Sequence, residues 1–481
     1  MDATRGRFGR RRDGRRVVKR SIASLVWASC LVAGVVDPNP IVTARALPII
    51  DVPNVVFILS DDQRADTLAK MPLIQHALVR YGVRFRRAHV VTPMCCPARA
   101  SILTGNFAHT TGVWGNRGKH GGYGAFDDST TLATALQGAG YRTGLFGKYL
   151  NGYGKGADPT FVPPGWDSWN AILSRGKEYY SYTLNEDGVT HTYGDAPEDY
   201  LTDVLFSKAS EFAGRAMEDG QPFFAFLTPT APHAYAVPER EYAHDFDDLA
   251  PWRPDSYNER DMSDKPAFSS RMRSLTAGAT ANVDRFRQRQ YETLESLDED
   301  TLALVDQIRA AGQLENTVFI YTSDNGYLWG EHRMIGKNLP YEEATRVPLV
   351  IRYQGTFPHS TNGKLATNID LAPTILELAG AQMDTDGVSL VSYMQGTAAF
   401  PRTRHLIESM GGTFMPPWCM LQTERTTFTH YATGQEEYYN LEQDPLQLTN
   451  TVREQDPSKL RELRAQLRSM CSPLPPGMAP W

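Results

Sequence analysis

The chain has 481 residues, of which 41% are hydrophobic and 22% charged, and its formal net charge at pH 7 is −6. This composition is typical of a globular protein, and the length suits one large domain with a smaller one or two to three smaller domains. The acidic charge balance and the lack of P-loop and zinc-finger spacings argue against a nucleic-acid-binding protein.

The first 46 residues differ in composition from the rest of the chain. Nine of the first twenty are Arg or Lys, an apolar run follows at 21–36, and Ala44-Arg45-Ala46 forms a small-x-small pattern. This order predicts an export signal over residues 1–46, because the apolar run is short for a membrane span. An uncleaved membrane anchor is the alternative. Cleavage would leave 39 basic and 52 acidic residues, a formal net charge of −13. We therefore expect a secreted or extracytoplasmic protein with no stable membrane span.

Two apolar runs of the chain end in oxygen-rich side chains. The run at 54–59 leads into Ser-Asp-Asp at 60–62, and the run at 316–322 leads into Ser-Asp-Asn-Gly at 323–326. Short apolar runs rich in β-branched residues are typical of buried parallel strands. Ligands of open α/β sheets bind at the carboxyl ends of the strands. We therefore expect these polar side chains to meet at one edge of a sheet.

The remaining elements predict an α/β fold with a large, mostly parallel sheet that helices cover on both faces. From about residue 405 the pattern changes to short alternating strands followed by a helix, which predicts a smaller C-terminal α+β subdomain with an antiparallel sheet. The predicted organisation is an export signal at 1–46, a catalytic domain at 47–404 and a C-terminal subdomain at 405–481, with a long surface insertion at 246–273. Further strands are expected at 142–146, 223–228, 348–352, 426–431 and 437–441, and helices at 132–139, 200–213, 286–311, 371–379 and 458–470.

The five cysteines are unevenly placed. One lies in the predicted signal, two are the neighbours Cys95 and Cys96, and two lie near the C-terminus. Because exported proteins form disulfides, Cys419 and Cys471 are a plausible pair, with two isolated buried thiols as the alternative. A disulfide between adjacent cysteines is strained, and two adjacent thiolates cannot easily share one tetrahedral zinc ion. The doublet therefore leaves open that one of its cysteines is modified.

The polar side chains at the two strand ends offer a metal site. Taken singly, Asp61 and Asp62 could cap a helix, and Asp324-Asn325 could form a turn. Taken together, they are three carboxylates and one carboxamide, an all-oxygen set that suits Ca²⁺, or alternatively Mg²⁺. Oxygen ligands without thiolates argue against zinc and copper.

The cysteine doublet belongs to a longer pattern. Cys95-Cys96-Pro97-Ala98-Arg99, followed by Thr-Gly at 104–105, fits Cys-x-Pro-x-Arg with a downstream Thr-Gly. This pattern resembles the signature of type I sulfatases, in which a formylglycine-generating enzyme oxidises the first cysteine to Cα-formylglycine. The resemblance implies that Cys95 is converted and that Cys96 fills the variable position. Ala98 departs from the serine that the family often has there.

The resemblance extends over most of the chain after residue 46. Phe-Gly-Lys-Tyr-Leu-Asn at 146–151, Thr-Ala-Pro-His at 230–233 and Gly-Lys-Asn-Leu-Pro-Tyr-Glu at 336–342 are similar to further active-site segments of the family, in the same order. The double cysteine, "GKYLNGYG", "VPPGW", "YYSYTLNEDG" and "YLTDVL" are most similar to N-acetylglucosamine-6-sulfatases. The resemblance implies a sulfated carbohydrate or aryl sulfate as substrate.

The resemblance also implies a role for each site residue. The hydrated aldehyde at position 95 attacks sulfur with help from Asp324 and is regenerated by elimination of sulfate, so that one difficult step becomes two. Electrostatic stabilisation of the sulfuryl oxygens falls to the metal and three cations, and His233, shared with Lys337, protonates the leaving oxygen. The implied catalytic residues are Cys95, Arg99, Lys148, His233 and Lys337, and the implied metal ligands are Asp61, Asp62, Cys95, Asp324 and Asn325.

Two positions leave the assignment of roles incomplete. Many members of the family have a histidine where this chain has Leu150, so the base for the elimination step is not assigned. His332 is as consistent with packing as with function. The alternatives for the whole chain are a broad arylsulfatase, a phosphonate or phosphate monoester hydrolase of the same superfamily, and a catalytically silent binder of sulfated glycans.

Overall fold

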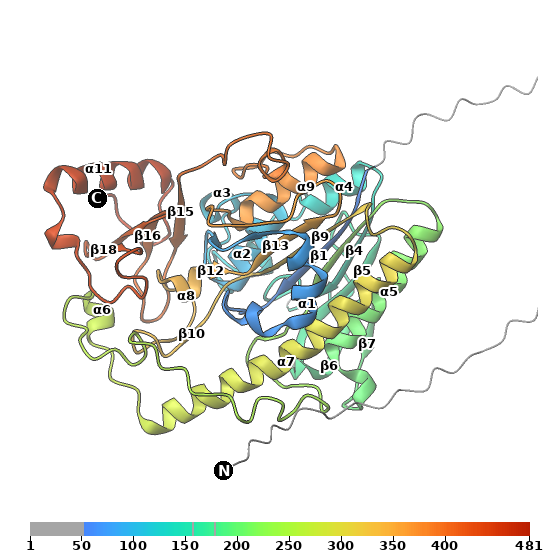
Figure 1. Ribbon diagram of the computed structural model, residues 1–481, viewed down its shortest axis with the longest axis horizontal. Helices are drawn as coiled ribbons and strands as arrows, with labels where there is room; N and C mark the ends of the chain where they lie inside the picture. Colours follow the sequence, from blue (N-terminus) through green and yellow to red (C-terminus); the bar gives the residue numbers. More distant parts are fainter. Residues whose placement is uncertain (1–51, 156–157, 178) are drawn as a thin grey trace, which may run out of the picture. The chain divides into compact units, whose positions relative to one another are not determined.

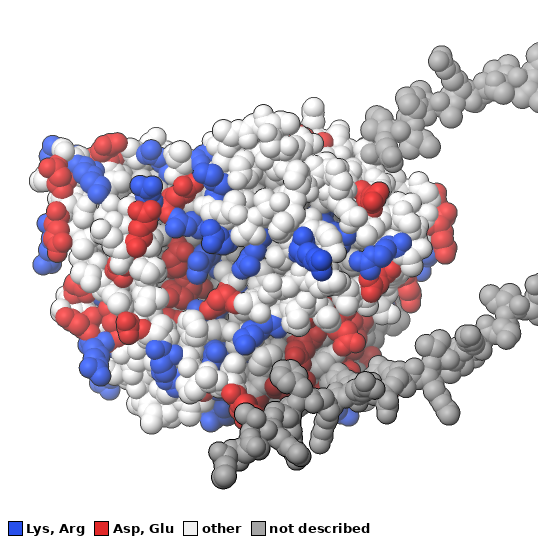
Figure 2. Space-filling model, in the orientation of Figure 1, with Lys and Arg blue, Asp and Glu red and all other residues white. Residues whose placement is uncertain are grey.

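The computed structural model describes residues 52–155, 158–177 and 179–481. Residues 51–481 belong to one compact unit, and the predicted export signal at 1–46 lies outside the described residues. On the face drawn in Figure 2, Lys and Arg side chains lie mainly across the middle, and Asp and Glu side chains lie mainly around and below them.

Among the described residues, ten strands form one mixed sheet in the order β14-β2-β13-β9-β1-β8-β4-β5-β6-β7 (Figure 1). The five central strands from β9 to β5 run parallel to one another. Antiparallel pairs lie at both sides, where β13 meets β9 and β5–β6–β7 forms hairpins. The strands are β1 (Asn54–Ser60), β2 (Val83–Phe85), β4 (Arg142–Gly147), β5 (Ser168–Lys177), β6 (Tyr180–Glu186), β7 (Val189–Thr192), β8 (Phe223–Thr228), β9 (Thr317–Ser323), β13 (Leu349–Tyr353) and β14 (Ser360–Asn362).

Helices cover both faces of this sheet, as the sequence predicts (Figure 1). Side chains of β1 alternate between the faces. Val55, Phe57 and Leu59 pack with α2, α4 and α9, whereas Val56 and Ile58 pack with α1, α5 and α7. Strand β1 is therefore buried on both sides, which explains its uninterrupted apolar run. The helices are α1 (Pro72–Ala77), α2 (Cys95–Thr104), α3 (Ala108–Thr111), α4 (Leu132–Gly138), α5 (Leu201–Glu218), α6 (Ala267–Ser270), α7 (Ala277–Ala310), α8 (Glu342–Thr345), α9 (Leu371–Ala379), α10 (Val391–Met394) and α11 (Pro457–Met470).

The C-terminal part forms a separate antiparallel sheet of β15, β16, β17 and β18, beside which α11 lies (Figure 1). A disulfide joins Cys419 of β16 to Cys471, directly after α11, which confirms the predicted pair. The predicted boundary at 404/405 falls at the start of β15 and stays a prediction. The small strands are β3 (Ala88–His89) with β12 (Arg346–Val347), β10 (Leu328–Trp329) with β11 (Ile335–Gly336), and β15 (Arg404–Ser409), β16 (Trp418–Thr423), β17 (Thr426–Tyr431) and β18 (Glu436–Asn440).

The segment at 246–273 differs from the surface insertion that its composition predicts. It has little regular structure apart from α6, but several of its side chains are buried. Lys265 Nζ is buried and donates hydrogen bonds to Tyr439 Oη at 3.0 Å and to the Leu448 carbonyl at 2.9 Å. The segment thus packs against the C-terminal sheet, which its hydrophilic sequence does not indicate.

A buried histidine pair connects the C-terminal sheet to the rest of the fold. The rings of His89 on β3 and His405 on β15 lie 5.1 Å apart, and both are almost fully buried. Among the described residues, neither ring nitrogen of His405 has a hydrogen-bond partner. Burial, reinforced by His89 and Arg402, holds the pKa of His405 well below its usual range.

We therefore expect acid to destabilise the protein through His405. Below about pH 6.5, His405 is protonated in the unfolded chain but stays neutral in the folded protein. The unfolding free energy therefore falls by up to about 1.4 kcal/mol per pH unit as the pH decreases. The measurement is urea unfolding from pH 7 to pH 5 of wild type and His405→Phe, which keeps an aromatic ring and removes the titration. The variant should show a shallower pH dependence. Identical slopes would contradict this account.

Candidate functional site

The carboxyl ends of β1 and β9 bring the predicted acidic residues together. Ser60 of β1 pairs with Ser323 of β9 in parallel register, so the residues that follow both strands lie at the same level of the sheet. The Asp62 amide donates to Asp324 Oδ1 at 3.2 Å, and Asn325 Nδ2 donates to Asp62 Oδ1 at 2.6 Å. All four side chains predicted here are buried: Asp61, Asp62, Asp324 and Asn325.

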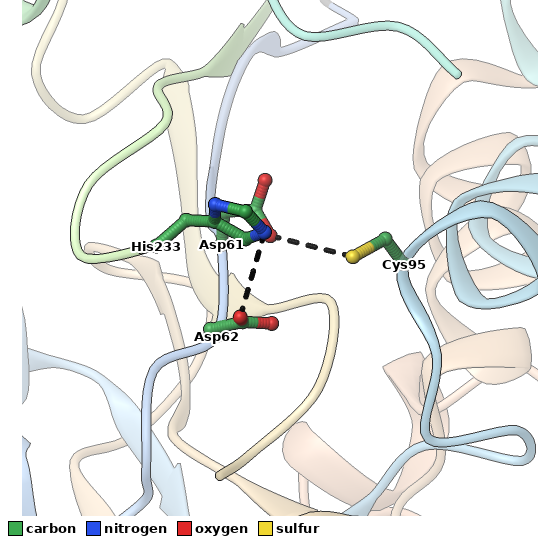
Figure 3. A group of neighbouring side chains, drawn as sticks. All are labelled: Asp61, Asp62, Cys95 and His233. Carbon is green, nitrogen blue, oxygen red and sulfur yellow. Dashed lines mark hydrogen bonds and ion pairs between the residues drawn. The ribbon is translucent and has the colours of Figure 1, made fainter. Parts of the chain in front are cut away.

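Helix α2 points its first residue at this cluster. Cys95 opens the helix, and its Sγ lies 3.6 Å from Asp61 Oδ1 (Figure 3). Arg99 follows four residues later on the same side of the helix, where its Nε donates to Asp324 Oδ2 at 2.8 Å and its Nη2 lies 3.4 Å from Asp61 Oδ2. Nη2 has no hydrogen-bond partner among the described residues, although it is buried. The helix start and the guanidinium thus offer positive potential to an anion.

Cys96 faces away from the cluster. Its side chain is buried in the apolar core on the α2 side of the sheet, and burial raises the pKa of its thiol to about 12. Its amide donates to Asn116 Oδ1 at 2.9 Å. The structure therefore separates the two cysteines: one thiol lies at the polar cluster and the other is a core thiol of low reactivity.

Two lysines and a histidine complete the cluster. Lys148, directly after β4, contacts Asp61, and Lys337, directly after β11, contacts Asp62. Lys337 Nζ also lies 2.7 Å from Cys95 Sγ. His233 follows β8 through a short turn, and its Nε2 lies 3.7 Å from Asp62 Oδ2 (Figure 3).

The charges of the cluster shift its pKa values in opposite directions. Burial alone would raise the pKa of Asp61, but Lys148 and the other nearby cations hold it well below its usual range. For Asp324, burial and the neighbouring Asp61 charge outweigh the cations and raise the pKa. The carboxylates overcome the effect of burial on Lys148 and Lys337, and raise the pKa of both. One carboxylate is thus held ionised while another can accept a proton.

The residues present fit a divalent cation. Asp61, Asp62, Cys95 and His233 each offer one ligand atom, and these atoms lie within 4.8 Å of one another. Asn325 Oδ1 is buried and accepts no hydrogen bond from the described residues, so it is free to contact a cation. Carboxylate and carboxamide oxygens are the ligands of Ca²⁺ and Mg²⁺. This grouping also brings His233 within ligand distance, whereas the sequence assigns it to proton transfer only.

The cluster opens into a cleft of about 840 Å³. Its lining includes Lys148 and His233 of the cluster, Asn116 and Arg117, and the loop at 410–413, which follows β15. The sequence prediction missed Asn116, Arg117 and this loop. The glycine-bounded run Gly-Asn-Arg-Gly-Lys-His-Gly at 115–121 was the available signal, because a loop rich in Gly and basic residues is typical of anion contact.

The structure gives the positions of Leu150 and His332 relative to the cleft. Leu150 is almost fully buried and lines the cleft, and its aliphatic side chain cannot act as a base. His332 is fully buried, stacks on Tyr341 at 4.1 Å and has its Nδ1 2.7 Å from Glu259 Oε2. It does not line the cleft, which favours the packing role.

Comparisons with known proteins agree with these features. The family model described as Sulfatase matches residues 53–381, and the one described as N-sulphoglucosamine sulphohydrolase, C-terminal, matches residues 330–472. A putative extracellular sulfatase Sulf-1 homolog from Caenorhabditis elegans is 36% identical over 335 residues, which are 68% of this chain and 46% of that protein. The chain thus spans less than half the length of that relative.

Two further similarities cover more of the related proteins. The N-acetylglucosamine-6-sulfatase of Homo sapiens is 33% identical over 374 residues, 75% of this chain and 67% of the relative. A protein solved in complex with its substrate D-glucosamine-2-N,6-O-disulfate superposes with a TM-score of 0.76 at 22% identity, over 87% of this chain and 97% of that one, and so shares the fold. From the family match over more than half of its length, we conclude that the chain belongs to the sulfatase family.

Proposed function

We propose that this protein is a sulfuric ester hydrolase that removes sulfate from a sulfated sugar, of the N-acetylglucosamine-6-sulfate or another glycosaminoglycan type. The observation that supports this proposal most strongly is the position of Cys95. It is the first residue of α2 and lies beside Asp61, Lys337 and the buried carboxylates at the end of the cleft. The names of the relatives, N-acetylglucosamine-6-sulfatase and extracellular sulfatase, support the substrate class.

Two groups complete the proposed site. A divalent cation, Ca²⁺ in preference to Mg²⁺, would be held by Asp61, Asp62, Asp324 and Asn325 next to residue 95, where it would supply Lewis-acid stabilisation of the sulfuryl oxygens. Conversion of Cys95 to Cα-formylglycine by a formylglycine-generating enzyme would supply the nucleophile.

The residues of this chain bind the sulfate and move protons. Arg99 Nη2, which has no hydrogen-bond partner among the described residues, can donate to a sulfate oxygen. Lys148 and Lys337 are paired with Asp61 and Asp62, but each ammonium group keeps further N–H donors for the sulfate oxygens as charge develops. Asp324, a buried carboxylate whose Oδ2 accepts from Arg99 Nε at 2.8 Å, accepts the proton of the nucleophile. His233 Nδ1 lies 2.6 Å from the Ala234 carbonyl, which favours a proton on Nδ1 and orients the ring, while Nε2 faces the cluster to serve the leaving oxygen.

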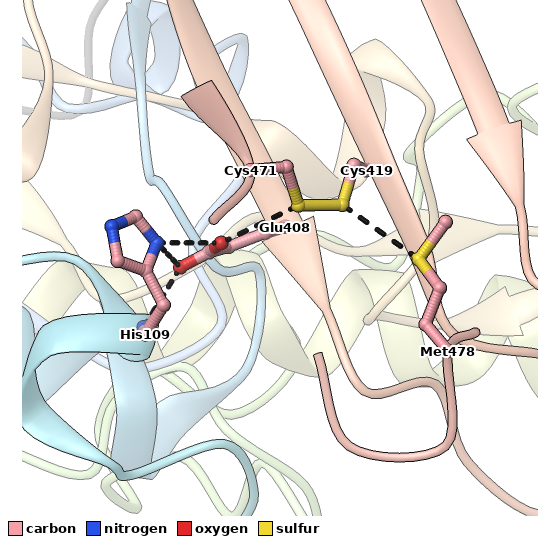
Figure 4. The surroundings of a disulfide bond; sticks show 5 residues. All are labelled: His109, Glu408, Cys419, Cys471 and Met478. Atoms are coloured by element: carbon pink, nitrogen blue, oxygen red, sulfur yellow. Dashed lines mark hydrogen bonds and ion pairs between the residues drawn. A yellow bond between two sulfur atoms is a disulfide. The ribbon is translucent and has the colours of Figure 1, made fainter. Parts of the chain in front are cut away.

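We further propose an extracytoplasmic location, with residues 1–46 as export signal, 47–404 as catalytic domain and 405–481 as subdomain. The disulfide Cys419–Cys471 supports this location, because disulfides persist in oxidising compartments. Figure 4 shows it beside Glu408, which also contacts His109 Nδ1 at 2.9 Å, so the linked segment is tied to the large domain. None of the described helices has the length and apolarity that a membrane span requires.

The test of the proposed function is a substrate panel. Purified protein is incubated with N-acetylglucosamine-6-sulfate, 4-nitrophenyl sulfate and a phenyl phosphonate monoester, and the released anions are quantified. We expect sulfate release from the sugar ester. Release from the phosphonate alone would favour the phosphonate hydrolase, and no release from any ester by protein carrying the modified cysteine would favour a silent glycan binder.

Replacing His233 by Ala should damage the reaction of basic leaving groups most. A general acid contributes about 10²–10⁴-fold when the departing alkoxide needs a proton. We therefore expect kcat/KM to fall by at least about 100-fold on N-acetylglucosamine-6-sulfate and by less than about 10-fold on 4-nitrophenyl sulfate. The control is His191→Ala, because His191 lies exposed on β7. Equal losses on both substrates would remove His233 from this role.

A further inference from the structure

The outer part of the cleft carries positive charge that the reacting centre does not use. Arg117 and Lys155 both line the cleft, are exposed, and form no ion pair with any described residue. No Asp or Glu is among the described lining residues. The cleft therefore presents unneutralised cations within a protein of net negative charge.

The loop at 115–122 is fixed relative to the reacting centre. Asn116 Oδ1 accepts a hydrogen bond from the Cys96 amide at 2.9 Å, one residue from Cys95. The Gly122 amide donates to the Gly115 carbonyl at 2.9 Å, and a Cβ at Gly121 would lie only 2.3 Å from that carbonyl oxygen. The loop backbone is thus closed on itself, and Arg117 projects from a position set by α2.

The second cation is also held in place by its backbone. The Lys155 amide donates to the Gly152 carbonyl at 3.0 Å, which forms a turn directly after the Lys148 segment. A Cβ at Gly154 would lie 2.5 Å from Leu173 Cδ2, so this turn packs closely on β5. Lys155 therefore reaches the cleft from an ordered turn.

We propose that Arg117 and Lys155 bind a second anionic group of the substrate, so that this protein prefers sugars with two or more anionic groups over monosulfated sugars. The inference rests on the proposed function, because the first sulfate occupies the inner end with Arg99, Lys148 and Lys337. The cleft of about 840 Å³ lies toward the upper end of the roughly 300–1,000 Å³ of small-molecule sites, which leaves room beyond one sulfate ester. The second anion is a sulfate on the same sugar or a carboxylate on the neighbouring sugar.

The alternative is that Arg117 and Lys155 are ordinary cations exposed to solvent, with no role in binding. It predicts no selectivity, because an isolated exposed charge interacts weakly and equally with all anions in salt solution. Two cations converging on one cleft with no carboxylate in its described lining predict selectivity that weakens as salt rises. Substrate selectivity and its salt dependence therefore separate the two explanations.

The test is equilibrium binding to the non-reacting Cys95→Ala protein. Calorimetry measures the Kd of N-acetylglucosamine-6-sulfate, of glucosamine-2-N,6-O-disulfate and of N-acetylglucosamine-6-sulfate linked to a uronic acid. We expect at least one of the two dianionic ligands to bind about 10-fold more tightly than the monosulfate at low salt, with the preferred ligand identifying the second anion. The preference should shrink at high salt.

Adding Arg117→Ala and Lys155→Ala should abolish this preference and leave the Kd of N-acetylglucosamine-6-sulfate within about threefold. Arg117→Lys alone should retain part of the preference. The matched control is Lys70→Ala, which removes one exposed charge of the 3₁₀ helix Thr67–Lys70 outside the cleft. A preference that persists in the double variant, or no preference in the parent protein, would overturn the inference. Wild-type protein that carries the modified cysteine but releases no sulfate from these ligands, while Cys95→Ala binds them selectively, would instead overturn the proposed function, so the two failures are distinguishable.

Discussion

Cys95→Ala is expected to lower kcat for sulfate release by about 10⁴-fold or more, whereas Cys96→Ala should retain most activity. The structure gives the reason for this asymmetry. Cys95 Sγ lies beside Asp61 and Lys337, whereas Cys96 is buried in the apolar core. The measurement is kcat on 4-nitrophenyl sulfate, with the unfolding free energy of each variant determined in parallel.

The unfolding measurement separates chemistry from folding. Cys96→Ala removes a core side chain and should cost about 1 kcal/mol, with little effect on kcat. Cys95→Ser keeps a hydroxyl but offers only one, so it should be inactive or stop after a single sulfation. If Cys96→Ala stayed folded but lost kcat as strongly as we expect for Cys95→Ala, the assignment of the two cysteines would be contradicted.

Removal of divalent cations should reduce activity by more than about 100-fold, and Ca²⁺ or Mg²⁺ should restore it. The buried carboxylates, together with Asn325 Oδ1 that lacks a hydrogen-bond donor among the described residues, form a set suited to a hard cation. Thermal unfolding supplies a readout that does not depend on turnover. Saturating Ca²⁺ at about 100 times its Kd should stabilise the chelated protein by about 2.7 kcal/mol.

Asp62→Asn tests the same site by mutation. It removes a carboxylate that contacts Lys337 and Asn325, and it should lower both activity and the Ca²⁺-dependent stabilisation. The matched control is Asp284→Asn, which breaks a surface ion pair between Asp284 Oδ2 and Arg253 Nη2, 2.6 Å apart. Neither residue lines the cleft. Full turnover in excess chelator by protein shown to hold no metal would contradict the metal requirement.

The central strands and the acidic edge could be predicted from the sequence. The apolar runs of β1 and β9 are buried on both faces, and the polar residues after them share one edge because the strands pair in parallel register. Strand direction could not be predicted in the same way. The apolar run at 348–352 resembles these two, yet β13 runs antiparallel to β9, because burial on both faces leaves the same pattern in either direction.

Most residues that line the cleft, and the hairpins of β5, β6 and β7, could not be predicted from the sequence. Strands β5, β6 and β7 are part of the large sheet but were not predicted, since several residues of β6 and all of β7 are partly or fully exposed and lack a continuous apolar run. Asn116 and Arg117 reach the cleft because their loop closes against the start of α2, and the glycine-rich run at 115–121 does not by itself indicate that contact. Lys265 is buried for the same kind of reason, through partners far away in the chain.

Mass spectrometry of residue 95 in active enzyme tests the central claim most directly. Trypsin should release the peptide spanning residues 88–99, which contains both cysteines. In protein produced together with a formylglycine-generating enzyme, we predict an aldehyde in place of the Cys95 thiol, alkylation on Cys96 only, and specific activity proportional to the converted fraction. Fully active enzyme whose Cys95 is an unmodified, alkylatable thiol would contradict the formylglycine nucleophile and with it the proposed sulfatase mechanism.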